Sequence, residues 1–207
     1  MFVEALFAGK PQPFGPRQSP SSIIKKPFEQ LHVQLDGAIE DEQGNKKLHG
    51  GPEMAMHQFA QESYAALQKK FPTIDNKLVF GSIGENISAP RMNDTTVFIG
   101  DRYRFGEVVL EVNSPRAPCS KINQRFALKN IDLFIAEQGI TGWYYRVVET
   151  GKICLGDEIQ LEHRLSQTCS IKEIMRLVRS KDASASEKAD AASINGLAKE
   201  WVKKLKK

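Results

Sequence analysis

Many short β-prone runs divide the first four-fifths of this chain, and this pattern constrains its fold more than any other feature. The runs are rich in β-branched and aromatic residues, and glycine, proline and acidic residues separate them. They cover residues 2–8, 21–26, 28–35, 96–99, 107–112, 143–149 and 158–163. Because few helical segments lie between them, the pattern favours a sheet or barrel over a wrapped βαβ arrangement.

Helical patterns interrupt this β-prone region at two places. After Pro52, apolar residues recur at three- to four-residue spacing until Phe71-Pro72, which predicts one amphipathic helix. A second helical region begins near Cys119 and contains two short amphipathic stretches. It ends at Gly139, and glycine is typical of helix C-termini.

The composition changes after Leu165, where the β-branched residues give way to alanine- and lysine-rich sequence. Apolar positions at helical spacing, with capping patterns at Ser170 and Ser184, predict three short helices. We therefore predict a mainly β fold with added helices, of the α+β class. A barrel-like domain would span residues 1–165, and a small three-helix segment would span residues 166–207.

Charge, hydropathy and cysteine content narrow the class of protein. The 29 basic and 25 acidic residues give a net charge of +4, which mildly favours anionic ligands. Because the two signs are mixed along the chain and not segregated, the charge pattern is not that of a nucleic-acid-binding protein. Three cysteines without a CxxC pair argue against a disulfide framework or a structural zinc site. No run approaches 18 apolar residues, so we expect no membrane segment and a cytoplasmic location.

The segment NSPRAPCSKIN places a cysteine between two cationic side chains. Two prolines restrict the backbone before Cys119, and Arg116 and Lys121 are its near neighbours in sequence. Because a nearby cation stabilises a thiolate, this thiol has the surroundings of a metal ligand or a nucleophile. The alternative, an inert buried cysteine, is equally compatible with the local sequence.

Two glycine-containing loops hold further candidate residues. Lys46 and His49 precede Gly50-Gly51-Pro52, which is predicted to open the helix, and a helix N-terminus favours phosphate. A Gly-Gly-Pro turn, however, more often only connects two elements and binds no ligand. In FGSIGENIS, Glu85 and Asn86 follow a glycine, so they either hydrogen-bond a ligand or cap their own loop.

Five motifs, taken together and in order, resemble the MOSC domain, which is related to the C-terminal part of molybdenum cofactor sulfurases. They are KKLHGG at 46–51, HQFAQESY at 57–64, IGENI at 83–87, IGDRYRFGE at 99–107 and SPRAPCSKIN at 114–123. The C-terminal segment resembles the three-helix segment of the YiiM-like subgroup. The resemblance extends over residues 1–201, almost the whole chain.

The resemblance implies a barrel-like MOSC fold that binds a molybdenum cofactor (Mo-molybdopterin), with Cys119 as the metal ligand. Enzymes of the family reduce N-hydroxylated compounds, including hydroxylaminopurines, to amines, and His49 or Glu85 would deliver a proton beside Cys119. The implied cofactor-binding residues are Lys46, His49, Gly50, Gly51, Glu85, Asn86, Arg116 and Lys121. Where the family carries a Gly-Asp pair, this chain has Glu40-Asp41, so we expect an added negative charge near the cofactor.

Several functional hypotheses stay open at this point. A reductase of this kind would take electrons from an external, flavoprotein-type reductase, because the sequence shows no flavin or haem motif. The main alternative is a sulfur-carrier or cofactor-handling module with a persulfide on Cys119. A cysteine hydrolase and a nucleic-acid-binding basic tail are less favoured, and a homodimer is left open.

Overall fold

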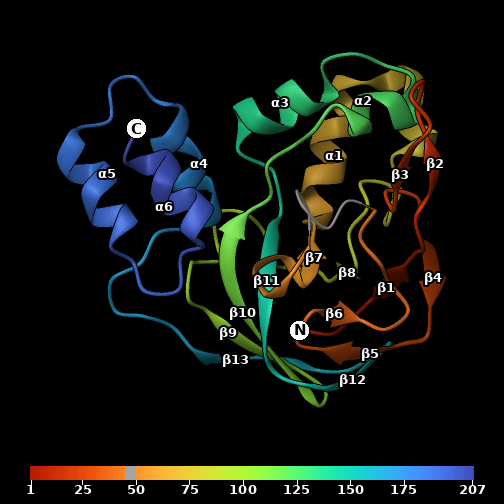
Figure 1. The fold of residues 1–207 in the computed structure, drawn as a ribbon, viewed down its shortest axis with the longest axis horizontal. Coiled ribbons are helices and arrows are strands. Elements are labelled where there is room, and N and C mark those ends of the chain that lie inside the picture. Colours follow the sequence, from red (N-terminus) through yellow and green to blue (C-terminus); the bar gives the residue numbers. More distant parts are fainter. Residues whose placement is uncertain (45–49) are drawn as a thin grey trace.

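The computed structural model describes residues 1–44 and 50–207, and most of its strands form one curled sheet (Figure 1). The strand order is β13-β9-β10-β11-β7-β8-β1-β4. In chain order these strands are β1 (Ala5–Ala8), β4 (Lys26–Phe28), β7 (Met56–Gln58), β8 (Ile87–Ser88), β9 (Arg102–Phe105), β10 (Val108–Pro115), β11 (Trp143–Glu149) and β13 (Ile159–His163). Neighbouring strands are antiparallel, except that β7 and β8 are parallel.

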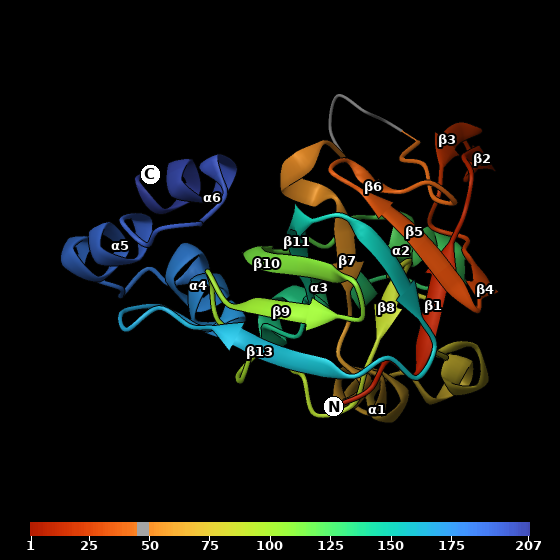
Figure 2. The same ribbon diagram turned by 90° about the horizontal axis from the view of Figure 1, so that it is seen from below.

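Two small sheets complete the β structure (Figure 2). One has the order β12-β5-β6, with β12 at Gly151–Cys154, β5 at Gln30–Gln34 and β6 at Gly37–Ala38. The other is a hairpin of β2 (Gln12–Phe14) and β3 (Ser19–Ser21). The α+β class and the half-barrel shape of the main sheet confirm the predicted fold class.

Strand β10 forms the centre of the hydrophobic core. All eight of its residues are buried, and Leu110 and Val112 belong to the same apolar cluster as Trp143 and Tyr145 of β11. An eight-residue strand enclosed on both faces is a rigid support, because its side chains are held by packing and its backbone by two neighbouring strands. Arg116 follows directly at the end of this strand.

Helices α1 (Gln61–Lys70), α2 (Lys121–Phe126) and α3 (Ile131–Gln138) pack at one end of the sheet (Figure 1). With the short 3-10 helix η2 (Pro72–Lys77) they enclose a second apolar cluster that includes Phe59, Leu67, Ile122 and Ile135. The two stretches predicted between Cys119 and Gly139 are confirmed as α2 and α3. Gly139 ends α3 in the left-handed conformation, at φ +64°.

The prediction that a helix opens at Gly50-Gly51-Pro52 is wrong. Pro52 begins only a one-turn 3-10 helix, η1 (Pro52–Met54), and the chain then enters strand β7. Residues 56–58 form a strand and not a helix because they pair with the edge of β11 and are all buried there. The helix itself begins only at Gln61.

The three predicted C-terminal helices are confirmed as α4 (Ile171–Arg179), α5 (Ala185–Ala192) and α6 (Lys199–Leu205). The Ser170 side chain accepts a hydrogen bond from the Glu173 amide, and Ser184 forms a full capping box. Ile174, Trp201 and Leu205 pack into the same core as the sheet. The boundary between residues 165 and 166 stays a prediction.

The predicted strands differ in how well they match. The run 143–149 is β11 without change, 107–112 lies within β10 except for its first residue, and 158–163 shifts by one residue. The run 96–99 contributes only an isolated bridge from Phe98 to Ser170, and 21–26 divides between β3, a loop and β4. Strands β9 and β12, with four residues each, were not predicted.

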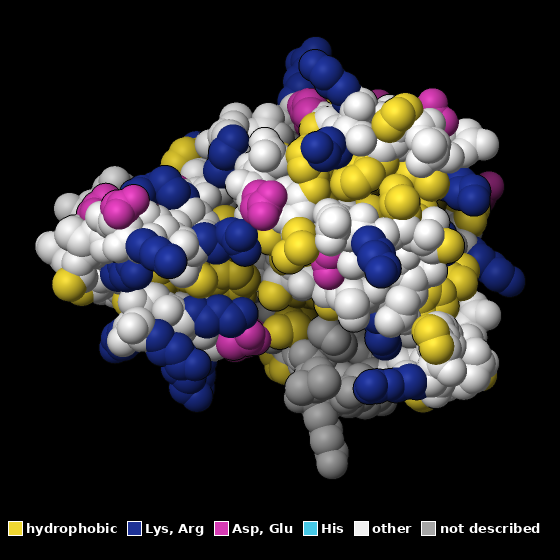
Figure 3. Space-filling model, turned by 90° about the horizontal axis from the view of Figure 1, so that it is seen from above, with side chains coloured by type: hydrophobic (Ala, Val, Ile, Leu, Met, Phe, Trp, Pro, Cys, Tyr) yellow, Lys and Arg dark blue, Asp and Glu magenta, His cyan; other side chains and the backbone are white. Residues whose placement is uncertain are grey.

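Basic side chains are dispersed on the face shown in Figure 3 and do not collect into one stripe. Hydrophobic side chains gather there mainly beside the helices. Across the described ranges 1–44 and 50–207, the structure contains no helix with the length and hydrophobicity needed to span a bilayer.

Asp94 is a buried carboxyl group that accepts a 2.8 Å hydrogen bond from the Gly142 amide at the start of β11. Burial raises its pKa to about 7, so the folded chain binds a proton more tightly than the unfolded chain does. The stability from this proton is complete below about pH 4 and is lost as the pH rises through 7.

We therefore expect Asp94→Asn to be more stable than wild type at pH 8, by up to about 4 kcal/mol. The two proteins should differ much less at pH 4, since asparagine resembles the protonated acid. Urea denaturation at both pH values measures the difference, with Asp36→Asn, a change at an exposed residue, as the control. A constant difference between the two pH values would contradict the prediction.

Candidate functional site

A cleft lies where the end of β10, strand β7, the start of β11 and two N-terminal loops meet. Its cavity volume is about 110 Å³, and it opens to solvent on one side. The described residues that line it are Ser21, Ser22, Ile23, Lys25, Asp41, Glu42, Gln43, Gly44, Met54, His57, Gly84, Asn86, Arg116, Ala117, Cys119, Lys121 and Tyr144. The cleft is thus lined by segments that lie far apart in the sequence.

Cys119 lies in this cleft, between the end of β10 and the start of α2. Its side chain is partly exposed, and its carbonyl oxygen accepts a 3.0 Å hydrogen bond from the Ile122 amide, which fixes the backbone at the first turn of α2. Cys119 is therefore partly accessible and lines the cleft, and its reactivity stays a prediction. Among the described cleft residues it is the one thiol.

Arg116 brings positive charge to the same wall. Its backbone amide donates a 3.0 Å hydrogen bond to the Gly142 carbonyl, which holds the residue against β11, and only 8% of the residue is exposed. Its guanidinium hydrogen-bonds the Tyr144 side chain, and it forms no ion pair with a carboxylate of the described ranges. A buried, unpaired guanidinium favours an anionic ligand.

Lys25 and Asp41 form a buried ion pair at the opposite wall. Lys25 Nζ lies 2.6 Å from Asp41 Oδ2, and their side chains are only 5% and 7% exposed. Burial lowers the pKa of Lys25, while the Asp41 carboxylate opposes that shift. Lys25 therefore compensates the Asp41 part of the added negative charge expected from Glu40-Asp41, and Glu40 Oε1 lies 2.6 Å from His32 Nδ1.

His57 faces the cleft from β7, and its ring packs against Tyr144 with 5.3 Å between the centroids. Burial and the nearby Arg116 and Lys25 charges hold its pKa well below the usual range, so the ring is neutral. Its buried Nε2 atom has no hydrogen-bond partner among the described residues. Such an orphaned polar atom costs about 1–3 kcal/mol, which a suitable ligand would recover.

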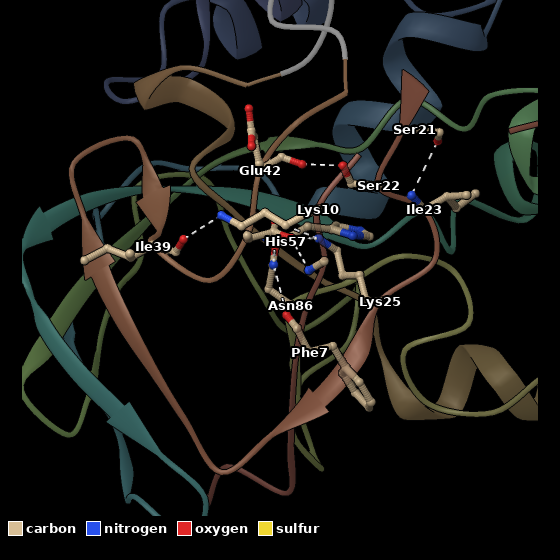
Figure 4. Close-up of polar contacts among 12 residues, drawn as sticks. Phe7, Lys10, Ser21, Ser22, Ile23, Lys25, Ile39, Glu42, His57 and Asn86 are labelled. Carbon is tan, nitrogen blue, oxygen red and sulfur yellow. Dashed lines mark hydrogen bonds and ion pairs between the residues drawn. The ribbon is translucent and has the colours of Figure 1, made fainter. Parts of the chain in front are cut away.

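Asn86 holds the histidine strand in place (Figure 4). Its side-chain oxygen accepts a 3.0 Å hydrogen bond from the His57 amide, and its own amide donates a 2.7 Å bond to the His57 carbonyl. Asn86 Nδ2 donates to Asp41 Oδ2 at 2.9 Å and to the Phe7 carbonyl at 3.1 Å. One carboxamide thereby ties β7, β1 and the Lys25–Asp41 pair together.

Glu85 is fully buried and is absent from the described lining of the cleft. Its Oε1 accepts hydrogen bonds from the Tyr64 hydroxyl at 2.5 Å and the Gly81 amide at 2.6 Å. Burial raises the pKa of this carboxyl group, against the lowering effect of the Tyr64 hydrogen bond. In this position Glu85 anchors the loop that carries Asn86 through Oε1, and its buried Oε2 has no hydrogen-bond partner among the described residues.

A model of the MOSC domain matches residues 45–160, more than half of the chain. The chain belongs to the MOSC domain family. Protein YiiM of Escherichia coli strain K12 is 30% identical, over 98% of this chain and 90% of the relative, so this MOSC protein is YiiM-like. A protein of Gibberella moniliformis named Reductase is 35% identical over 84% of this chain, which spans only 31% of that relative.

The fold of this MOSC protein is also similar to solved structures. A crystal structure of a hypothetical protein superposes with a TM-score of 0.85 at 26% identity, covering 99% of this chain and 88% of the other. The curled sheet and the C-terminal helices are therefore both shared with that structure.

The cleft brings together some of the residues that the MOSC resemblance implies. Cys119, Asn86, Arg116 and Lys121 all line it, and Lys121 Nζ donates a 3.1 Å hydrogen bond to the Pro20 carbonyl. Gly50 and Gly51 have positive φ values of +104° and +77° but are absent from its described lining. Lys46 and His49 lie outside the described residues.

The cleft residues of this MOSC protein that were not predicted from the sequence include Lys25, His57 and Tyr144. Lys25 sits in an ordinary basic dipeptide, and nothing local distinguishes it. His57 was assigned to a helix, which hid its pairing with Tyr144 across β7 and β11. The signal available was the strand propensity of WYYRVVE, whose partner strand had to be sought elsewhere in the chain.

Proposed function

We propose that this protein binds a molybdenum cofactor in the cleft, with Cys119 as metal ligand, and reduces N-hydroxylated compounds to amines. Membership in the MOSC family and the relative named Reductase support an oxidoreductase of this type. The observation that carries the proposal is the position of Cys119, a partly exposed thiol in a cleft that also holds the unpaired Arg116. A soft thiolate beside a cation suits a metal that is bound mainly through sulfur.

The residues present fit such a cofactor. A molybdopterin is an anion with a heterocyclic edge of hydrogen-bond donors and acceptors, and the cleft offers Arg116 and Lys121 for its negative charge. Asn86 is fully used within the protein and contributes rigidity. The orphaned Nε2 of His57 is a free hydrogen-bonding atom at the same place.

When bound, the cofactor would supply the two-electron chemistry, and the protein would supply the ligand, the orientation and the local charge. The overall reaction converts an N-hydroxylated compound, two electrons and two protons into an amine and water. Neutral His57 can accept a hydrogen bond, since burial and nearby positive charges lower its pKa and keep the ring unprotonated, and Glu85 is enclosed behind the cleft wall. The electrons would come from a separate reductase of the flavoprotein type.

A sulfur-carrier function is the second candidate, because the same partly exposed Cys119 can hold a persulfide. Arg116 would stabilise its anionic terminal sulfur in the same way as a thiolate. Turnover separates the two functions. Cofactor-loaded protein given an artificial electron donor should reduce a hydroxylamino base if it is a reductase, and should show none if it is a carrier.

The decisive experiment measures molybdenum bound per chain after expression in a host that makes the cofactor. Cys119→Ser should retain about tenfold less metal or worse, since even the loss of a residue that only supports a ligand costs that much. Cys154→Ser and Cys169→Ser are matched controls, because neither residue lines the described cleft. Equal molybdenum in wild type and Cys119→Ser would remove the ligand role.

A further inference from the structure

The His57 ring is held in one orientation by contacts on several sides. Asn86 bonds both backbone groups of His57, accepting from its N–H at 3.0 Å and donating to its carbonyl at 2.7 Å. Tyr144 is its register partner on β11 and also packs on the ring, at 5.3 Å between centroids. His57 lines the cleft, and turning its ring would break the packing on Tyr144.

The hydrogen bonding of the ring defines what that atom can do. The backbone of Gly84 favours the protonated form of the His57 ring, as a carbonyl oxygen does beside a ring N–H. Nε2 has no hydrogen-bond partner among the described residues. A neutral imidazole carries its proton on one nitrogen only, so a proton on Nδ1 leaves Nε2 with a lone pair that can accept a hydrogen bond.

We propose that His57 is a ligand-binding residue whose Nε2 accepts a hydrogen bond from an N–H or O–H group of the molecule in the cleft. The inference rests on the proposed function and adds a residue to it. Two groups could donate this hydrogen bond: an N–H group of the cofactor's pterin, and the N–OH group of the substrate. Arg116 and Lys121 would hold the anionic part of the ligand, and His57 would select a donor group beside it.

The test compares two variants of nearly matched shape. His57→Asn places its amide nitrogen near the position of Nδ1, keeps a donor for Gly84 and has no atom at Nε2. His57→Gln reaches the Nε2 position with an atom that can accept a hydrogen bond. His32→Asn serves as the control, since His32 lies outside the described cleft and contacts Glu40.

Molybdenum and pterin content per chain report on the cofactor, and KM with an artificial electron donor reports on the substrate. We expect His57→Asn to lose about threefold to tenfold in one of these two quantities, the range for one neutral hydrogen bond. His57→Gln should recover most of the loss, and His32→Asn should match wild type. Reduced cofactor content identifies the pterin as the donor, and a raised KM alone identifies the substrate.

The thermal unfolding of the cofactor-free proteins separates ligand binding from a structural role. Because Nε2 bonds no described residue, His57→Asn should unfold within a few degrees of wild type. If it does not fold, His57→Phe keeps the ring packing on Tyr144 and gives the same readouts. This inference alone would be overturned if wild type and His57→Asn bound equal amounts of molybdenum and had the same KM. If wild type itself bound no molybdenum, the proposed function and this inference would both be overturned.

Discussion

Asp41→Ala should lower the free energy of unfolding by about 3–5 kcal/mol, because it leaves the buried Lys25 ammonium without its counter-charge. The change also removes the acceptor for the Gly9 amide, at 2.8 Å, and for Asn86 Nδ2, at 2.9 Å. Since domains are stable by only about 5–15 kcal/mol, the variant should lose a large fraction of its total stability. Urea denaturation followed by circular dichroism measures the loss.

An exposed ion pair provides the control for this variant. Glu200 Oε1 and Lys204 Nζ lie 2.6 Å apart in α6, with 52% and 30% of their side chains exposed. Glu200→Ala should therefore change the stability by less than about 1 kcal/mol. The double variant Lys25→Met, Asp41→Leu should recover part of the loss, because it removes both charges. A small effect of Asp41→Ala would mean that the Lys25 charge is solvated in solution.

Gly142→Ala should cost about 2–4 kcal/mol and should also weaken cofactor retention. Gly142 adopts φ +67°, and a Cβ atom there would collide with the Gln58 carbonyl oxygen. The collision can be relieved only by moving β7 away from β11, and the His57–Tyr144 pair lies on those strands. Denaturation and bound molybdenum are the two measurements.

Gly156→Ala is the matched control for Gly142→Ala. Gly156 has a similar φ of +83°, but a Cβ atom there would meet nothing within 4 Å. It should therefore cost only the backbone strain, about 1–2 kcal/mol, and leave cofactor retention unchanged. The difference between the two variants isolates the contact between strands. Equal losses in both would show that the β7–β11 spacing adapts freely.

Residues whose local sequence decides their structure were predicted well. The alternation in WYYRVVE predicts β11 without error, and Gly139 and the Ser184 capping box mark real helix ends. The helix expected after Pro52 failed because helical spacing of apolar residues also suits a short strand followed by a helix. Only the available edge of β11, almost ninety residues later in the chain, decides between them.

The residues of the cleft also differ in whether nearby sequence or distant contacts determine their positions. Cys119, Arg116 and Lys121 are neighbours in sequence, so their proximity was predictable. The charge of Lys25 is set by Asp41, and the orientation of His57 by Asn86, and these contacts depend on loops that the sheet brings together. Sequence indicated a carboxylate at Glu85, but only packing shows that Tyr64 and Gly81 enclose it.

The shared core of sheet and C-terminal helices determines how the basic tail can be studied. The Ala198 amide bonds the Asn113 carbonyl of β10, and Trp201 and Leu205 are buried in the main apolar cluster. Removing the residues after 165 would expose the apolar surface that these helices cover, and exposed apolar patches promote aggregation. A truncated protein would therefore lose function because it misfolds. A charge reversal at solvent-facing Lys203 tests the role of the tail's positive charge in a protein that still folds.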